Sequence, residues 1–148
     1  MFACTFIGHK DFPENLYQNL YNEIENLIVF DCVNVFYVGT NGAFDRAVYR
    51  VLSELKKKYE IKINVALAHL NQKSTNFYKS EETFFPNVLE RTPFKYAINK
   101  RNIFMIKQSQ YMICYLNNTF SNSSTFVKSA KSRKLKIVNI GSFDISKL

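Results

Sequence analysis

Hydrophobic residues along the chain fall into short continuous runs and longer stretches with helical spacing. Three runs in the first half, over residues 2–7, 33–38 and 61–68, are apolar, β-branched and aromatic, and predict buried strands. Between them, apolar side chains recur at helical spacing over residues 16–28 and 44–55, which predicts two amphipathic helices. This β-α-β-α-β order favours a parallel sheet with helices on both faces.

The second half of the chain begins with a long polar stretch. Residues 71–92 show no sustained period, so we expect a loop that lies over the site formed by the neighbouring turns. Its aromatic pair, Phe84 and Phe85, either caps a ligand base or packs the loop down, and packing is favoured. Two more helices are predicted over residues 94–108 and 125–133, and two more strands over residues 111–116 and 135–140. The sequence therefore predicts one Rossmann-like α/β domain over residues 1–148, with a mainly parallel five-stranded sheet and helices on both faces.

Composition narrows the class of protein. The chain has 148 residues, 47% of them hydrophobic, and no apolar stretch is long enough to span a membrane. The N-terminus lacks the pattern of a signal peptide, and Cys4, Cys32 and Cys114 lie in or beside apolar segments without metal-ligand spacing. We therefore expect a cytoplasmic protein with buried thiols and with no metal or cofactor. The net charge of +8 is spread along the chain, so nucleic-acid binding is not favoured.

The strongest chemical signal is the turn that follows the second predicted strand. A helix begins directly after this turn, and Asp45 lies in its first turn. Glycines let the backbone approach a ligand and the first helical N–H groups attract anions, so the turn predicts a phosphate site. Asp45 either stabilises the helix start or accepts a hydrogen bond from a sugar hydroxyl. The residues of the turn are Gly39, Thr40, Asn41 and Gly42.

Other predicted site residues come from distant parts of the chain. Gly8 and His9 end the first strand and reach the same edge of the sheet, where His9 either carries a proton or is a hydrogen-bonded turn residue. Arg101 lies on the apolar face of a predicted helix, so it needs an anionic partner, either a ligand phosphate or a carboxylate such as that of Asp45. The polar turn before the last helix supplies helix caps or a second phosphate contact through Ser123, Ser124 and Thr125.

The order of these motifs resembles the SLOG superfamily, which includes the Lonely Guy phosphoribohydrolases and DNA-processing protein A. Phe-Ile-Gly-His-Lys ends the first strand, Gly-Thr-Asn-Gly-Ala-Phe-Asp follows the second, and Arg-Asn-Ile-Phe-Met precedes the fourth. The chain is most similar to small bacterial members of uncharacterised role. The resemblance covers nearly the whole chain and implies a homo-oligomer that binds a nucleotide-derived ligand. By position it assigns Gly39, Gly42 and Asp45 to the glycine-rich turn, Arg101 to the helix arginine, and residues 123–125 to the second phosphate turn.

One departure from the family pattern concerns catalysis. The phosphoribohydrolases carry a glutamate three residues after the threonine of the second phosphate turn, and this chain has Lys128 there. Only Asp45 or Glu82 could supply the missing carboxylate. We therefore expect a binding module that senses a nucleotide-derived molecule of the ADP-ribose or cyclic-nucleotide type. The alternative is a nucleotide N-glycosidic hydrolase or transferase with Asp45 or His9 as the catalytic group, and nucleic-acid binding is a third interpretation.

Overall fold

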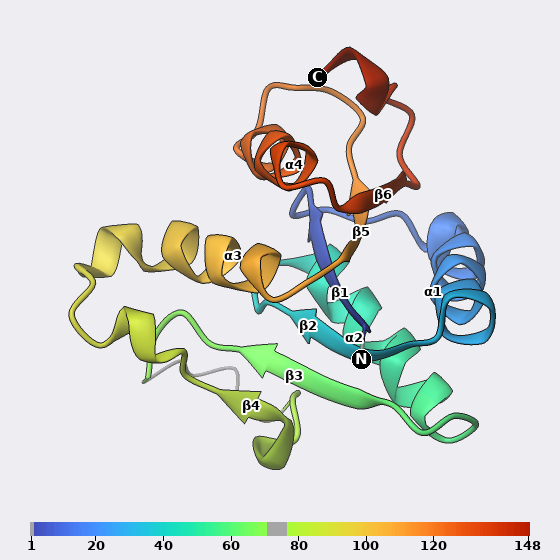
Figure 1. Cartoon of the computed structure of the whole chain (residues 1–148), viewed down its shortest axis with the longest axis horizontal. Helices are drawn as coiled ribbons and strands as arrows, with labels where there is room; N and C mark the ends of the chain where they lie inside the picture. Colours follow the sequence, from blue (N-terminus) through green and yellow to red (C-terminus); the bar gives the residue numbers. More distant parts are fainter. Residues whose placement is uncertain (1, 71–76) are drawn as a thin grey trace.

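The computed structural model describes residues 2–70 and 77–148, and its centre is a six-stranded sheet (Figure 1). The strand order is β4-β3-β2-β1-β5-β6, and every pairing is parallel. The predicted α/β class and Rossmann-like domain are confirmed. The strands are β1 (Phe2–Gly8), β2 (Val33–Val38), β3 (Lys62–Ala66), β4 (Thr83–Phe84), β5 (Tyr111–Tyr115) and β6 (Lys136–Asn139).

Helices cover both faces of the sheet, as predicted. Side chains of α1 (Tyr17–Asp31) and α2 (Ala43–Lys56) pack on one face, and those of α3 (Ala97–Lys107) and α4 (Ser123–Ser132) pack on the other. Within the described ranges, no helix combines the length and the apolar character needed to cross a membrane. Short 3₁₀ helices complete the fold: η1 (Glu14–Leu16), η2 (Ser80–Glu82), η3 (Asn87–Leu89), η4 (Phe94–Tyr96) and η5 (Ile145–Lys147).

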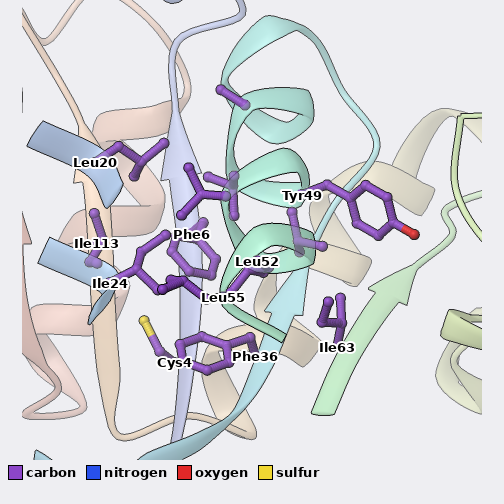
Figure 2. Packing of buried hydrophobic residues seen from close by; sticks show 14 of the residues in the cluster. Cys4, Phe6, Leu20, Ile24, Phe36, Tyr49, Leu52, Leu55, Ile63 and Ile113 are labelled. Carbon is purple, nitrogen blue, oxygen red and sulfur yellow. The ribbon is translucent and has the colours of Figure 1, made fainter. Parts of the chain in front are cut away.

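The larger core lies between the sheet and the α1–α2 pair. Leu20 and Ile24 of α1 and Leu52 of α2 are fully buried against Phe6 and Phe36 of the central strands (Figure 2). Because side chains alternate across a strand, the remaining positions of β1 and β5 face α3 and α4 and form a second core. The apolar positions that repeat with helical or strand spacing in the sequence are thus the ones that form the two hydrophobic cores.

The sixth strand corrects the sequence analysis. Residues 71–92 were expected to form a loop, but β4 lies within them and pairs with the end of β3. The strand is only two residues long, too short to produce a detectable period. The Phe84 ring packs against Tyr37 and Phe104, with centroids 6.3 and 5.9 Å away, which agrees with the packing alternative. The part of the predicted loop over residues 71–76 lies outside the described residues.

The cysteines need a second correction. Cys4 and Cys114 are buried as expected, but Cys32 is exposed and has a φ of 58°. It follows the last residue of α1 in the left-handed conformation that commonly ends a helix. Its position therefore reflects the end of α1 and not the core.

Candidate functional site

The topology of the sheet places a cleft at one edge. After β1 the chain runs outward to β2 and β3, and it later returns to the other side of β1 as β5. Ligands of open parallel sheets bind where the strand order reverses in this way, outside the carboxyl ends of the strands. A cleft of about 770 Å³ lies at this point. The turns after β1, β2 and β5 line it together with one side of α3.

Arg101 and Asp45 are the buried charged residues of the cleft wall. Their exposed fractions are 1% and 8%, and both line the cleft. Arg101 donates through Nη1 to Thr40 Oγ1 at 3.1 Å and to the carbonyl of Ala66 at 3.4 Å, and through Nε to Asn102 Oδ1 at 3.2 Å. Three elements far apart in the sequence therefore fix the guanidinium in one orientation.

Gly39 lies beside both charged groups. A Cβ added to Gly39 would lie 3.0 Å from Arg101 Nη2 and 3.0 Å from Asp45 Oδ2. The ion pairs among the described residues do not include Arg101 with Asp45, so their charged atoms are farther apart than 4.0 Å. Asp45 instead accepts the N–H of Asn41 through Oδ2 at 2.7 Å. The salt bridge to Asp45, one of the two alternatives for Arg101, is therefore not formed, although the two groups are close.

Burial controls the protonation of these groups. Burial raises the pKa of Asp45 above its ordinary value, although the Arg101 charge, the Asn41 N–H and Arg46 act against the rise. Burial also lowers the pKa of Arg101, and Asp45 opposes that change. Burial raises the pKa of the nearby Tyr78 to about 12, and the Asp45 carboxylate adds to the rise. Each charge only partly offsets the desolvation of the other, so a further polar partner would stabilise both.

Gly42 has a packing role that the sequence did not reveal. Its φ is 101°, and a Cβ on this residue would lie 2.7 Å from the carbonyl oxygen of Lys10. That carbonyl accepts the N–H of Ala43 at 2.6 Å. Because the N–H of Asn41 is also bonded, to Asp45, two of the amides expected to attract a phosphate are already paired within the chain.

Replacing Gly42 with alanine is expected to destabilise the fold by about 2 kcal/mol, because the conformation is essentially restricted to glycine and the new methyl group meets backbone atoms. Urea unfolding measures this loss. Adding Lys10→Ala should not restore stability, since the closest atoms are the Lys10 carbonyl oxygen and Cα. A Gly42→Ala protein as stable as the wild type would contradict the packing role.

His9 acts in the structure as a connector of turns. Its Nε2 accepts the N–H of Asn117 at 2.9 Å, which leaves the proton of the neutral ring on Nδ1, 3.1 Å from Ser121 Oγ. Both ring nitrogens therefore have hydrogen-bond partners, which agrees with the alternative that His9 is a hydrogen-bonded turn residue. Gly8 precedes it, and a Cβ there would lie 2.6 Å from the Phe44 ring.

Of the site residues predicted in the β5–α4 turn, some line the cleft and others do not. Ser123 lines the cleft and donates to the carbonyl of Gly8 at 2.9 Å. Ser124 is buried and donates to the carbonyl oxygens of Thr119 and Ser121, which gives it a structural role in the turn. Thr125 and Lys128 are exposed on α4 and lie outside the cleft wall. Of the turn after β2, Asn41 lines the cleft, whereas Gly39, Thr40 and Gly42 do not.

Several cleft residues were not identified from the sequence. Phe120 lines the cleft although its side chain is 93% exposed, so one ring face is open to a ligand. The sequence feature that could have indicated this role is an aromatic residue inside a polar turn. Lys10 and Lys95 add positive charge, and Asp11 adds one negative charge. Amide side chains from α3 and the β5–α4 turn add donors and acceptors: Asn99, Asn102, Asn117, Asn118 and Asn122.

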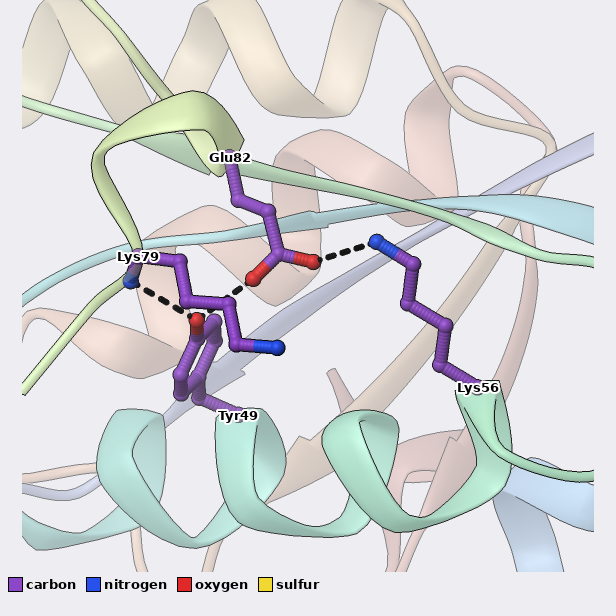
Figure 3. Close-up of polar contacts among 4 residues, drawn as sticks. All are labelled: Tyr49, Lys56, Lys79 and Glu82. Atoms are coloured by element: carbon purple, nitrogen blue, oxygen red, sulfur yellow. Dashed lines mark hydrogen bonds and ion pairs between the residues drawn. The ribbon is translucent and has the colours of Figure 1, made fainter.

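Glu82 lies in a different cluster and cannot replace the missing glutamate. Its Oε1 accepts the hydroxyl of Tyr49 at 2.5 Å and its Oε2 contacts Lys56 Nζ at 2.7 Å (Figure 3). Tyr49 Oη in turn accepts the N–H of Lys79 at 3.0 Å. These contacts hold η2 and β4 against α2, and none of the four residues lines the cleft.

Among the described residues, no group of histidine, cysteine and acidic side chains could hold a metal ion.

Comparison with protein-family models finds no match for this sequence, and comparison with curated proteins finds none either. The resemblance to the SLOG superfamily therefore stays a prediction. The arguments that follow depend on the residues of the cleft and their geometry.

Proposed function

We propose that the protein binds a nucleotide or a nucleotide-derived small molecule, of the ADP-ribose or cyclic-nucleotide type, in this cleft. The observation that carries the proposal is the buried guanidinium of Arg101 in the cleft wall. A buried cation is costly unless it is paired, and the Asp45 carboxylate lies beyond ion-pair distance. A polar ligand in the cleft would complete its coordination.

The size and lining of the cleft suit such a ligand. Its volume of about 770 Å³ lies within the range of small-molecule sites. Lys10 and Lys95 are exposed and can neutralise phosphates at the rim. Amide side chains can hydrogen-bond a base, and Phe120 offers a ring face for stacking. The cleft therefore combines the contacts that phosphate, sugar and base require.

Binding without hydrolysis is favoured because the expected catalytic carboxylate is missing. Lys128 occupies its sequence position and is exposed on α4, and Glu82 is bonded elsewhere. One observation supports N-glycosidic hydrolysis as a second candidate: Asp45 lines the cleft and its pKa is raised by burial, as in many general acids. Incubation with AMP and NAD, followed by chromatography for free base, separates the two functions. We expect no release.

A thermal-shift screen with AMP, NAD, ADP-ribose and cyclic AMP tests the proposal directly. A ligand at a hundred times its Kd should stabilise the protein by about 2.7 kcal/mol. The same ligand should stabilise Lys100→Ala as much as it stabilises the wild type, because Lys100 is exposed on α3 and lies outside the cleft wall. If none of the four compounds raises the melting temperature, the proposal fails.

The homo-oligomer and the cytoplasmic location expected from the sequence remain predictions.

The Phe120→Ala variant should weaken nucleotide binding by about fivefold to a hundredfold, the effect of losing one base-stacking contact. The melting temperature without ligand should stay that of the wild type, because the ring is 93% exposed. Isothermal titration calorimetry measures the affinity, and Phe120→Tyr, which keeps the ring, should bind normally. Equal affinity of the alanine variant would show that the base does not stack there.

A further inference from the structure

The space between Arg101 and Asp45 has a defined size. Arg101 Nη2 and Asp45 Oδ2 both lie 3.0 Å from the Cβ position of Gly39, so they are at most twice that distance apart. They are also farther apart than the 4.0 Å limit of an ion pair. The gap between Nη2 and Oδ2 is therefore wider than an ion pair but narrow enough for one oxygen atom to bridge it with a hydrogen bond to each side.

Arg101 and Asp45 each have one charged-group atom without a hydrogen-bond partner among the described residues. Arg101 uses Nε and Nη1 for its three hydrogen bonds, and its Nη2 has no hydrogen-bond partner within residues 2–70 and 77–148. Asp45 Oδ1 accepts no hydrogen bond in the same part of the chain, since the Asn41 N–H is bonded to Oδ2. Buried polar atoms are almost always paired in native proteins, so these two unpaired atoms on neighbouring side chains of the cleft wall indicate a place for a polar ligand group.

We propose that Arg101 and Asp45 bind the ribose of an ADP-ribose-type ligand through its neighbouring 2′ and 3′ hydroxyls, which excludes a 3′,5′-cyclic nucleotide because its 3′ oxygen is esterified. This inference rests on the proposed function and names the part of the ligand that enters the buried wall. A hydroxyl accepts from the Nη2 of Arg101 and donates to the carboxylate of Asp45, so it satisfies both groups at once. The adjacent hydroxyl reaches the second carboxylate oxygen.

A phosphate fits this position poorly. It carries acceptor oxygens and negative charge, and it would be desolvated next to the Asp45 carboxylate. The exposed ammonium groups of Lys10 and Lys95 offer phosphate a better environment at the rim. On this proposal Arg101 contacts a sugar hydroxyl and not the ligand phosphate that was one of its two sequence alternatives, so the ligand enters with its sugar inward.

Calorimetric titration with AMP, 2′-deoxy-AMP, 3′-deoxy-AMP and ribose 5-phosphate tests the inference. Each missing hydroxyl should reduce affinity about tenfold to a hundredfold, the effect of one hydrogen bond to a charged group. Asp45→Asn should weaken AMP binding and remove most of the discrimination against the deoxy analogues. Gly39→Ala keeps both charges but places a methyl group in the space, and it should have the same effect. Lys100→Ala should bind like the wild type.

The possible outcomes separate this inference from the proposed function. Deoxy analogues that bind as tightly as AMP overturn the ribose assignment and leave nucleotide binding intact. Failure of both AMP and ribose 5-phosphate to bind the wild type also overturns it. The proposed function falls only if NAD, ADP-ribose and cyclic AMP fail as well. Unchanged discrimination in both Asp45→Asn and Gly39→Ala would show that the hydroxyls bind elsewhere in the cleft.

Discussion

Arg101→Met is expected to lower the free energy of unfolding by about 3–5 kcal/mol at pH 8, the cost of removing one charge from a buried pair. Methionine fills a similar volume, so packing contributes little to the loss. The loss arises because Asp45 keeps its buried negative charge without the opposing guanidinium, and because Thr40 and Ala66 each lose a donor. Urea unfolding gives the difference, and Lys100→Met is the control for removing an exposed charge from the same helix.

The pH dependence of this variant identifies the cause of the loss. Burial already raises the pKa of Asp45 in the folded protein, and the loss of Arg101 should raise it further. The folded state then holds the proton more tightly than the unfolded state, where the pKa is about 3.9. The stability of the variant should therefore fall as pH rises from about 4 to the raised folded pKa, and stay low above it. Combining Arg101→Met with Asp45→Asn should recover most of the loss at pH 8. A deficit that does not change with pH would contradict this explanation.

The layers of the fold could be predicted because each depends on a long, regular pattern. The apolar positions of residues 44–55 repeat at helical spacing, and the structure buries them as one side of α2. Strand β5 is a continuous apolar run because its alternate side chains belong to the two cores on its two faces. Strand β4 escaped detection because two residues cannot show a period, and its pairing with β3 depends on contacts distant in the sequence.

The site was predictable only in part. An arginine on an apolar helix face pointed to a buried anionic neighbour, and Asp45 does lie near it. The sequence could not show that a gap of more than 4.0 Å remains between the two charged groups, since this depends on how α2 and α3 are placed around the end of β2. It also assigned Gly42 to a phosphate, although the backbone of Lys10 occupies that position. Phe120 was missed because exposure and cleft lining are properties of the folded turn.

Glu82→Ala is expected to cost about 2–4 kcal/mol, because it leaves the buried hydroxyl of Tyr49 without its acceptor and removes a hydrogen-bonded carboxylate. The contact with Lys56 adds less, since 44% of that side chain is exposed and water screens the pair. Hydrogen exchange should show the loss locally, with faster exchange in η2 and β4, which this cluster holds against α2. Glu81→Ala, at the exposed neighbouring position, should have little effect.

Acid titration distinguishes this role of Glu82 from simple packing. Burial alone would raise the pKa of Glu82, but the hydrogen bonds from Lys56 and Tyr49 outweigh it, so the pKa lies below its ordinary value. Its contribution to stability is therefore present above the unfolded pKa of about 4.3 and is lost as pH falls through the lower folded value. The difference in stability between wild type and Glu82→Gln should consequently shrink in that window. Because a packing defect would not depend on protonation, a constant difference from pH 7 to pH 3 would assign the effect to shape and not to the carboxylate.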